Sequence, residues 1–319
     1  MQKNISALVD IGGTKILILL AAPGRKVLFR EKYSTPRERE PHAMAAALSA
    51  SLSQALENSG VLRDDLAGLG ICIAALVDYH KGVIYQAPNL GWFEPVPFRD
   101  MLQKEWPCPV LIENDANAAV VGEVYYGAAR GHRDVIYVTV STGIGGGLFL
   151  DGKLYRGCSG FAGEIGHIKP FGQGRQCNCG GMDCLEAWAA GTAIARRAAA
   201  LMGDETKNRG EVNTAWVFDQ AEAGNPRARA LIAETGVTLG IGLANLVTLL
   251  NPSCLVVGGG VAGNRASFLA QVWEQVKKSA IAPAVEVTRP MLVAAELEPE
   301  AGIWGMYALM NNELKTGGL

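Results

Sequence analysis

The chain has 319 residues, 49% of them hydrophobic, and a formal net charge of −2 at pH 7. This length exceeds what a single hydrophobic core usually supports, so two lobes are expected. No basic patch points to nucleic acid, and no long run of like charges points to a disordered tail. The composition therefore indicates a globular protein and argues against nucleic acid as a partner.

Targeting and membrane segments are not predicted either. Residues 5–22 lack the charged start and cleavage site of a signal peptide, and Asp10 and Lys15 interrupt their apolar run. We expect no apolar run long enough to cross a bilayer. The seven cysteines, an odd number, fit a reducing compartment. We therefore expect a soluble cytoplasmic protein with no membrane partner.

The first predicted element is a glycine hairpin near the N-terminus. Two β-branched, apolar runs flank the sequence DIGGTK at residues 10–15, which predicts a strand, a tight turn and a returning strand. The GxxxxGK[ST] pattern and the following helix of a P-loop are both missing. Turn amides and the Thr14 hydroxyl could hold phosphate oxygens, and Asp10 could hold a hydrated magnesium ion. A plain glycine hairpin is an equally good interpretation of these residues taken alone.

The next elements bring polar side chains to loops and strand ends. A helix is predicted over residues 41–60 and a buried strand over 66–78, followed by a turn-rich segment that contains Asn89. Residues 109–127 change from strand to helix periodicity at Asn114 and Asp115. Asp115 therefore lies at a strand end, where a side chain can face a cleft. The alternative role for Asp115 is the N-cap of the helix.

A second strand–glycine–strand unit lies midway along the chain. It occupies residues 134–157, around the sequence TGIGGG at 142–147. Two units of this kind predict a duplicated architecture with two phosphate-facing hairpins.

Cysteines and carboxylates crowd together in residues 158–188. Three thiols have the spacing C-x-C-x4-C, and a histidine lies ten residues before the first of them. This is a Cys3His set, which tetrahedral zinc prefers, and four protein ligands make the metal structural rather than catalytic. Ordinary buried thiols are the alternative. Glu164 and Glu186 flank the loop, and their carboxylates can accept hydrogen bonds from sugar hydroxyls.

The C-terminal part is predicted to be helical over residues 187–203 and 214–250, with a closing helix in the tail. Residues 258–263 match the dinucleotide pattern GxGxxG after a strand, and Glu286 lies near the distance expected for a ribose ligand. No following half of the dinucleotide fold is evident, and a single match is weak. A glycine turn against an adenosine is an equally good interpretation.

Seven of these motifs together resemble the ROK family (repressor, open reading frame, kinase), and within it the bacterial glucokinases. They occur in the family order over essentially the whole chain: DIGGTK, APNLGW, ENDANAA, TGIGGG, AGEIGH, CNCGGMDCLE and NPSCLVVGGG. The resemblance implies an α/β, actin-like ATPase fold of the hexokinase type, with two lobes around a central cleft. Residues 1–114 with the C-terminal helix 301–319 would form the smaller lobe, and residues 115–300 the larger lobe with the zinc loop and nucleotide site. Repressor members carry a winged helix-turn-helix before DIGGT, and with nine residues before Asp10 we expect no DNA-binding domain.

The resemblance also implies a role for each matching residue. Phosphate and magnesium would be handled by Asp10, Gly12, Gly13, Thr14 and Lys15, joined by Thr142, Gly143, Gly145 and Gly146. Gly259 and Gly260 would lie against the adenosine of ATP. The sugar would be bound by Asn89, Asn114, Asp115, Glu164, His167 and Glu186, with Asp115 as the catalytic base. Structural zinc would be bound by His167, Cys177, Cys179 and Cys184.

The activity implied is ATP-dependent phosphorylation of the 6-hydroxyl of a hexose, with glucose as the first choice. An N-acetylhexosamine kinase and a non-catalytic sugar-binding regulator are the alternatives, and a homodimer or higher homo-oligomer is expected. Three positions depart from the family pattern. Ala74 and Ala75 replace a usual Pro-Gly near the sugar loop, Ser141 replaces a common glycine, and Asp183 replaces a glycine and is expected to strain the metal turn.

Overall fold

The computed structural model describes residues 4–203, 212–263 and 265–316. The chain forms two compact units, which are described separately: unit 1 comprises Met1–Gly127, Arg156–Ala162 and Pro299–Leu319, and unit 2 comprises Ala128–Tyr155 and Gly163–Glu298. The expected boundary after residue 114 differs from this division. Residues 115–127 group with unit 1 because the helix that they form packs against the C-terminal helix.

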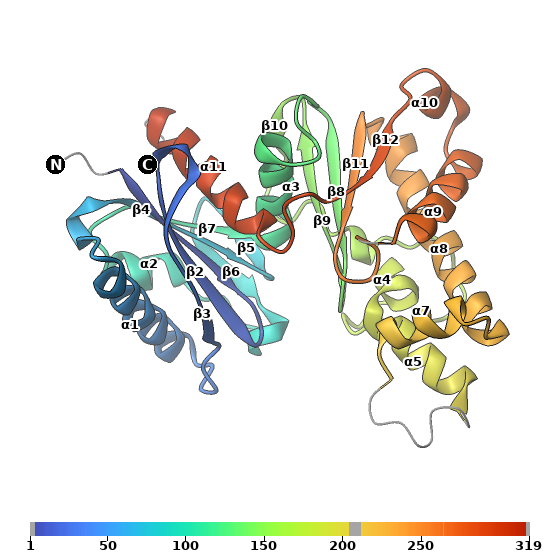
Figure 1. The fold of residues 1–319 in the computed structure, drawn as a ribbon, viewed down its shortest axis with the longest axis horizontal. Coiled ribbons are helices and arrows are strands. Elements are labelled where there is room, and N and C mark those ends of the chain that lie inside the picture. The colour runs from blue at the N-terminus through green and yellow to red at the C-terminus, as the bar shows by residue number, and fades with distance from the viewer. Residues whose placement is uncertain (1–3, 204–211, 264, 317–319) are drawn as a thin grey trace. The chain divides into compact units, whose positions relative to one another are not determined.

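Unit 1 is built on a five-stranded mixed sheet (Figure 1). Its strands, in the spatial order β3-β2-β1-β4-β7, are Lys26–Ser34, Lys15–Ala22, Ile5–Ile11, Leu66–Ile73 and Val110–Asn114. The first three form an antiparallel meander, whereas β4 and β7 run parallel to β1. The strands β5 (Leu76–Asp78) and β6 (Val83–Gln86) form a separate hairpin. The parallel strands place Asp10 and Asn114 toward the same edge of the sheet.

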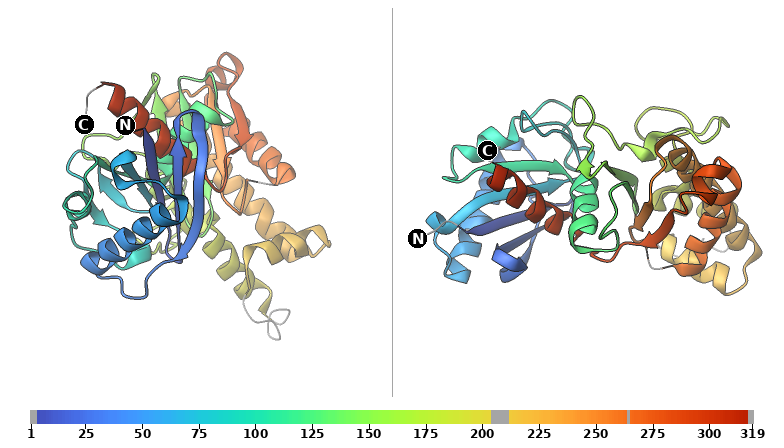
Figure 2. Two further views of the ribbon diagram at one scale, coloured as in Figure 1. Left: turned by 60° about the vertical axis from the view of Figure 1, so that its left-hand side comes forward. Right: turned by 90° about the horizontal axis from the view of Figure 1, so that it is seen from above.

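Helices cover both faces of this sheet. Helices α1 (Pro41–Ser59) and α2 (Phe98–Gln103) pack on one face with the main hydrophobic core of the unit. The other face receives α11 (Ala301–Thr316), which lies beside α3 (Asp115–Tyr126) in Figure 2. A side chain at Gly305 would overlap the carbonyl oxygen of Ala118, so glycine permits the close approach of the two helices.

Unit 2 repeats the same sheet topology. Its strands, in the spatial order β10-β9-β8-β11-β12, are Lys153–Leu154, Ile144–Leu150, Val135–Val140, Cys254–Gly258 and Met291–Ala294. Again the first three form an antiparallel meander and the last two run parallel to the first strand in sequence. The predicted duplication is therefore confirmed at the level of strand order and direction.

The helices of unit 2 pack with its sheet around a single large hydrophobic core. They are α4 (Leu185–Ala189), α5 (Gly191–Leu201), α7 (Thr214–Glu222), α8 (Pro226–Leu250), α9 (Ala266–Ser279) and α10 (Ala282–Glu286). The predicted single helix over 214–250 is wrong. Gly224 has a φ of 95°, Asn225 caps the next helix through its side chain, and Pro226 begins it, so the chain breaks there. The predicted helix 187–203 is likewise divided, because Ala190 has an extended backbone.

Helix α8 contradicts the expectation that no apolar run is long enough to cross a bilayer. With 25 residues, it is long and apolar enough to cross a membrane by length and composition alone. Most of its apolar window, 67%, is buried inside the fold, where Leu231, Leu239 and Leu243 belong to the core of unit 2. The apolar face of α8 is thus accounted for by packing within the protein.

Candidate active site

The first glycine hairpin joins β1 to β2 in unit 1. Its turn is closed by a hydrogen bond of 2.9 Å from the N–H of Gly12 to the carbonyl of Lys15, and Thr14 and Lys15 are exposed. Thr35 supports the turn from behind, because its hydroxyl donates to the carbonyl of Gly12 at 2.7 Å and its N–H to that of Thr14 at 3.0 Å. A supported turn with an exposed tip suits the binding of phosphate oxygens.

Arg39 links this hairpin to the segment that carries Asn89. Its guanidinium donates to the carbonyl of Gly13 at 2.8 Å and also to the carbonyl of Asn89. Asn89 lies in the short 3-10 helix Pro88–Leu90 and is exposed. Arg39 was missed by the sequence analysis because it belongs to no motif, and its two partners lie 26 and 50 residues away.

Two carboxylates lie near each other at the edge of the first sheet. Burial raises the pKa of Asp10 to about 7, and the negative charge of Asp115 is the second cause of this rise. Burial also raises the pKa of Asp115, whose carboxylate accepts the N–H of Ala116 at 2.9 Å. Cys72, the neighbour of Asp10 on β4, has its thiol pKa raised by burial. Two partly buried carboxylates favour a cation, and Mg²⁺ is commonly bound by one or two carboxylates together with substrate phosphates.

Asn114, rather than Asp115, is the N-cap of α3. The Asn114 side-chain oxygen accepts the N–H of Asn117 at 2.9 Å, and its amide donates to the carbonyl of Ala75 at 3.1 Å. The alternative role of Asp115 as the N-cap is therefore excluded, and its role as the catalytic base stays a prediction. A side-chain amide carries two N–H groups, so Asn114 can donate one hydrogen bond in addition to that to Ala75.

The second glycine hairpin joins β8 to β9 in unit 2. Its tip is Ser141–Gly143, where the N–H of Ser141 donates to the carbonyl of Gly143 at 2.9 Å. Gly145 and Gly146 lie in the strand β9 rather than at the tip. A side chain at Gly146 would overlap Ile165, so this glycine allows the segment before His167 to pack on the strand. The hydroxyl of Thr192 donates to the carbonyl of Thr142 at 2.8 Å.

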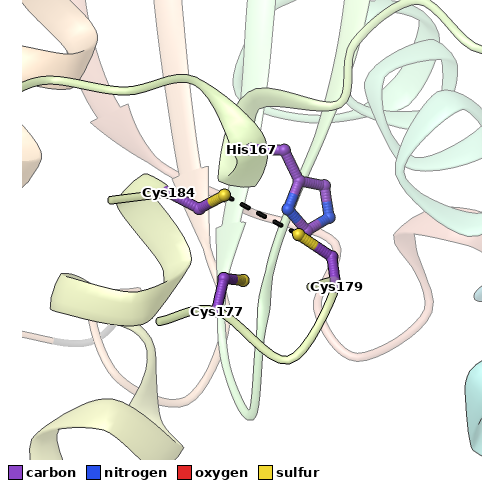
Figure 3. Close-up of side chains that lie close together, drawn as sticks. All are labelled: His167, Cys177, Cys179 and Cys184. Carbon is purple, nitrogen blue, oxygen red and sulfur yellow. Dashed lines mark hydrogen bonds between the residues drawn. The ribbon is translucent and has the colours of Figure 1, made fainter. Parts of the chain in front are cut away.

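The four predicted zinc ligands converge in unit 2 (Figure 3). The ligand atoms of His167, Cys177, Cys179 and Cys184 all lie within 4.8 Å of one another. The sulfur atoms of Cys179 and Cys184 are 3.7 Å apart, close to the about 3.8 Å expected for two thiolates on one tetrahedral zinc ion with Zn–S bonds of about 2.3 Å. The Nδ1 atom of His167 is buried and has no hydrogen-bond partner in the described part of the chain. These atoms fit a structural zinc ion.

The metal loop is the segment of residues 167–184 that carries the four predicted zinc ligands. The carboxylate of Glu186 contacts both this loop and the second glycine hairpin. One oxygen of Glu186 accepts the N–H of Ile144 at 2.9 Å, and the other lies 3.8 Å from the sulfur of Cys177. Glu164 lies next to the histidine of the cluster, with an oxygen 3.9 Å from Nε2 of His167. The structure thus places Glu164 beside His167 and Glu186 beside Cys177, and the binding of a sugar by these carboxylates stays a prediction.

Asp183 was expected to strain the metal loop, but its side chain stabilises the loop instead. Its φ of 59° is left-handed, which explains why glycine suits the position, yet its buried carboxylate accepts three successive backbone N–H groups. The donors are Gln173, Gly174 and Arg175, at 3.0, 2.9 and 2.8 Å. These hydrogen bonds lower the pKa of Asp183, and the bond from Arg175 has the largest effect. The carboxylate therefore compensates the backbone cost of the position.

The third glycine-rich turn follows β11. Gly259 has a φ of 88°, and a side chain there would overlap the carbonyl oxygen of Val140. Glu298 holds this turn, because one of its oxygens accepts the N–H of Gly259 at 2.6 Å and the hydroxyl of Tyr137 at 3.0 Å. No atom of the residues that the structure describes lies within 4 Å of a Cβ atom placed on Gly260, so a ligand can approach its backbone.

The dinucleotide interpretation of this turn is only partly supported. A parallel strand, β12, does follow β11 and α9, whereas no such continuation was expected from the sequence. Glu286, however, ends α10 before β12 begins and is exposed. The acidic residue that binds the ribose is expected at the end of the second strand of this unit, so Glu286 does not occupy that position.

Two sheets of identical strand order, with glycine turns and carboxylates at strand ends, define an actin-like ATPase fold. A family model described as the ROK family matches residues 6–313, and the chain belongs to the ROK family. It is 33% identical to a glucokinase of Streptomyces coelicolor, over 93% of this chain and 94% of the relative. Xylose repressors are also among the curated relatives.

Solved structures of the family agree over nearly the whole chain. The crystal structure of a ROK hexokinase from Thermus thermophilus is 34% identical, with a TM-score of 0.83, and covers 98% of this chain and 100% of that one. A ROK family glucokinase from Streptomyces griseus, in complex with glucose and AMPPNP, is 33% identical with a TM-score of 0.78 and covers 97% and 99%. The predicted fold class is therefore confirmed.

Proposed function

We propose that the protein is an ATP-dependent hexose kinase that phosphorylates the 6-hydroxyl of glucose. The observation that carries this proposal is the pair of neighbouring carboxylates, Asp10 and Asp115, at the strand ends beside the first glycine hairpin. The similarity to a glucokinase in complex with glucose and AMPPNP supports both the sugar and the phosphoryl donor.

In this proposal, Asp115 accepts the proton of the sugar 6-hydroxyl as its oxygen bonds to the γ-phosphorus of ATP, while the bond from that phosphorus to the β–γ bridging oxygen breaks and ADP leaves. Asp10 would hold Mg²⁺, which would offset the charge of the phosphates, and the glycine turns at residues 12–15 and 142–146 would each supply backbone N–H groups to phosphate oxygens. Gly259 and Gly260 lie against the adenosine. Hydroxyls of the sugar ring bind to Asn89, Asn114, Glu164, His167 and Glu186. Zinc bound by His167 and the three cysteines keeps Glu164 and Glu186 in place.

A coupled assay tests the activity. ATP with Mg²⁺ is offered with glucose, mannose, N-acetylglucosamine and N-acetylmannosamine, and ADP formation is followed for each sugar. We expect the highest kcat/KM for glucose, because a pocket that seats a 2-hydroxyl has no evident room for an acetamide. A higher kcat/KM for an N-acetylhexosamine overturns the choice of glucose.

A non-catalytic sugar-binding regulator is the second candidate, because xylose repressors are among the curated relatives of the chain. It predicts that sugar binds, as followed by tryptophan fluorescence, while no ADP forms with any sugar. Kinase activity that depends on Asp115 excludes this candidate.

We also infer a cytoplasmic homodimer or higher homo-oligomer that binds neither nucleic acid nor membrane. The balanced net charge of −2 and the burial of α8 within the fold support the last two points. Light scattering at several protein concentrations gives the oligomeric state. Fractionation of expressing cells shows whether the protein stays with the cytoplasm, and a monomer or a membrane-bound pool contradicts the inference.

A further inference from the structure

A buried ion pair lies at the end of β7, two residues before the proposed catalytic base in the sequence. The Nε of Arg156 donates to a carboxylate oxygen of Glu113 at 2.6 Å, and the Glu113 side chain is only 1% exposed. Glu113 is the penultimate residue of β7, next to Asn114 and Asp115. A carboxylate at this depth requires a cation, because a buried unpaired charge is strongly unfavourable.

The second oxygen of Glu113 supports the neighbouring site residues. It accepts the N–H of Asn114 at 3.0 Å and the side-chain amide of Asn117 at 3.1 Å. The N–H of Asn117 in turn donates to the side chain of Asn114, which caps α3. A single carboxylate therefore joins the end of β7 to the first turn of α3, and Asp115 is the first residue of that turn.

Arg156 is itself held in one orientation by unit 1. Its guanidinium lies over the ring of Tyr79, with the carbon 3.8 Å from the ring centroid. The segment that Arg156 begins continues along the same unit, because the ring of Phe161 meets Tyr85 edge-on at 5.4 Å. Gly160, with a φ of 92°, approaches the carbonyl of Val77 too closely for any side chain. Stacking on an aromatic face and a fixed planar donor are properties of arginine that lysine lacks.

We propose that Arg156 is a positioning residue for phosphoryl transfer, which acts through Glu113 to hold Asn114 and Asp115 in the reactive orientation. The inference rests on the proposed function, since the orientation of Asp115 matters only if Asp115 is the base. Neither Arg156 nor Glu113 touches the substrate in this role. A loss of order at Asp115 therefore lowers the rate of the chemical step more than it weakens sugar binding.

The test replaces Arg156 with methionine, which keeps an apolar stem of similar length and removes the ion pair. We expect kcat to fall on the order of 10²-fold, while the Kd for glucose, measured by tryptophan fluorescence, changes far less. The matched control is Arg133→Met, which breaks an ion pair of 2.8 Å with Asp151 whose side chains are 72% and 89% exposed. The control should keep the kcat of the wild type. Circular dichroism and thermal melting report the folding of each variant.

A folded Arg156→Met with the kcat of the wild type, or with a change confined to KM, overturns the proposal. If that variant does not fold, Arg156→Lys keeps the charge but not the stacked planar donor, and its kcat should still fall below that of the wild type. A Lys variant with full kcat then shows that the pair serves folding alone. If the wild type itself phosphorylates no hexose, the proposed function fails, and this result differs from an active wild type with an equally active Arg156→Met.

Discussion

Asp115 is the residue on which the proposed chemistry depends. Replacing it with asparagine keeps its size but removes the proton acceptor, so we expect kcat to fall by about 10²–10⁴-fold. The Kd for glucose should change little, because only one of several ring contacts is altered. Steady-state kinetics and equilibrium binding separate the two effects. Asp100→Asn on α2, where the carboxylate side chain is 63% exposed, is the control and should behave like the wild type.

Asp183 shows how a departure from the family pattern can be compensated. Its carboxylate accepts three consecutive backbone N–H groups of the metal loop. Asp183→Gly relieves the left-handed backbone but loses all three acceptor contacts, so we expect zinc to be released to a chelator several-fold faster than from the wild type. A chromogenic zinc indicator follows the release. An unchanged release rate means that zinc alone holds the loop.

Helix α11 packs against α3 through positions where only small residues fit. Gly305→Ala places a methyl group against the carbonyl oxygen of Ala118. We expect the free energy of unfolding to fall by about 1–3 kcal/mol, because the backbones must separate to accommodate the added atom. Denaturant titration measures the change. Gly203→Ala is the control, since no atom of the described residues lies within 4 Å of a Cβ atom placed there.

The elements and sites that the sequence predicted well are those specified by short spacings. The two glycine hairpins lie in stretches of a few residues, and three of the four zinc ligands lie within eight positions, so local pattern was sufficient. The supporting contacts join distant positions: Arg39 to Asn89, Arg156 to Glu113 and Glu298 to Gly259 are separated by 50, 43 and 39 residues. Such pairs follow from strand order, which one sequence does not specify. The break within 214–250 was missed because a continuous apolar face outweighed the local signal of Gly224, Asn225 and Pro226.

At the scale of the whole molecule, each unit has its own hydrophobic core. Loss of zinc should therefore loosen the metal loop of unit 2 and leave unit 1 largely unchanged, since a structural metal couples to the folding of its own surroundings. Cys179→Ala should contain less zinc than the wild type. Hydrogen exchange should rise in residues 165–186, with β1 and β4 protected as before. Equal loss of protection in both units contradicts this expectation, and a wild type purified without zinc contradicts the metal site itself.

The return of α11 to unit 1 has a consequence for the order in which the protein can be made. Buried residues of this helix, among them Ile303, Met306 and Met310, cover one face of the first sheet, yet the ribosome adds them after all of unit 2. At typical elongation rates, that face stays uncovered for on the order of ten to thirty seconds after α3 has emerged. Unit 2 has all its segments available earlier, so it is the half that can complete its core first. During that interval the face of the first sheet that carries Gly68, Gly70 and Cys72 lacks the helix that later covers it, so its core stays incomplete until translation ends.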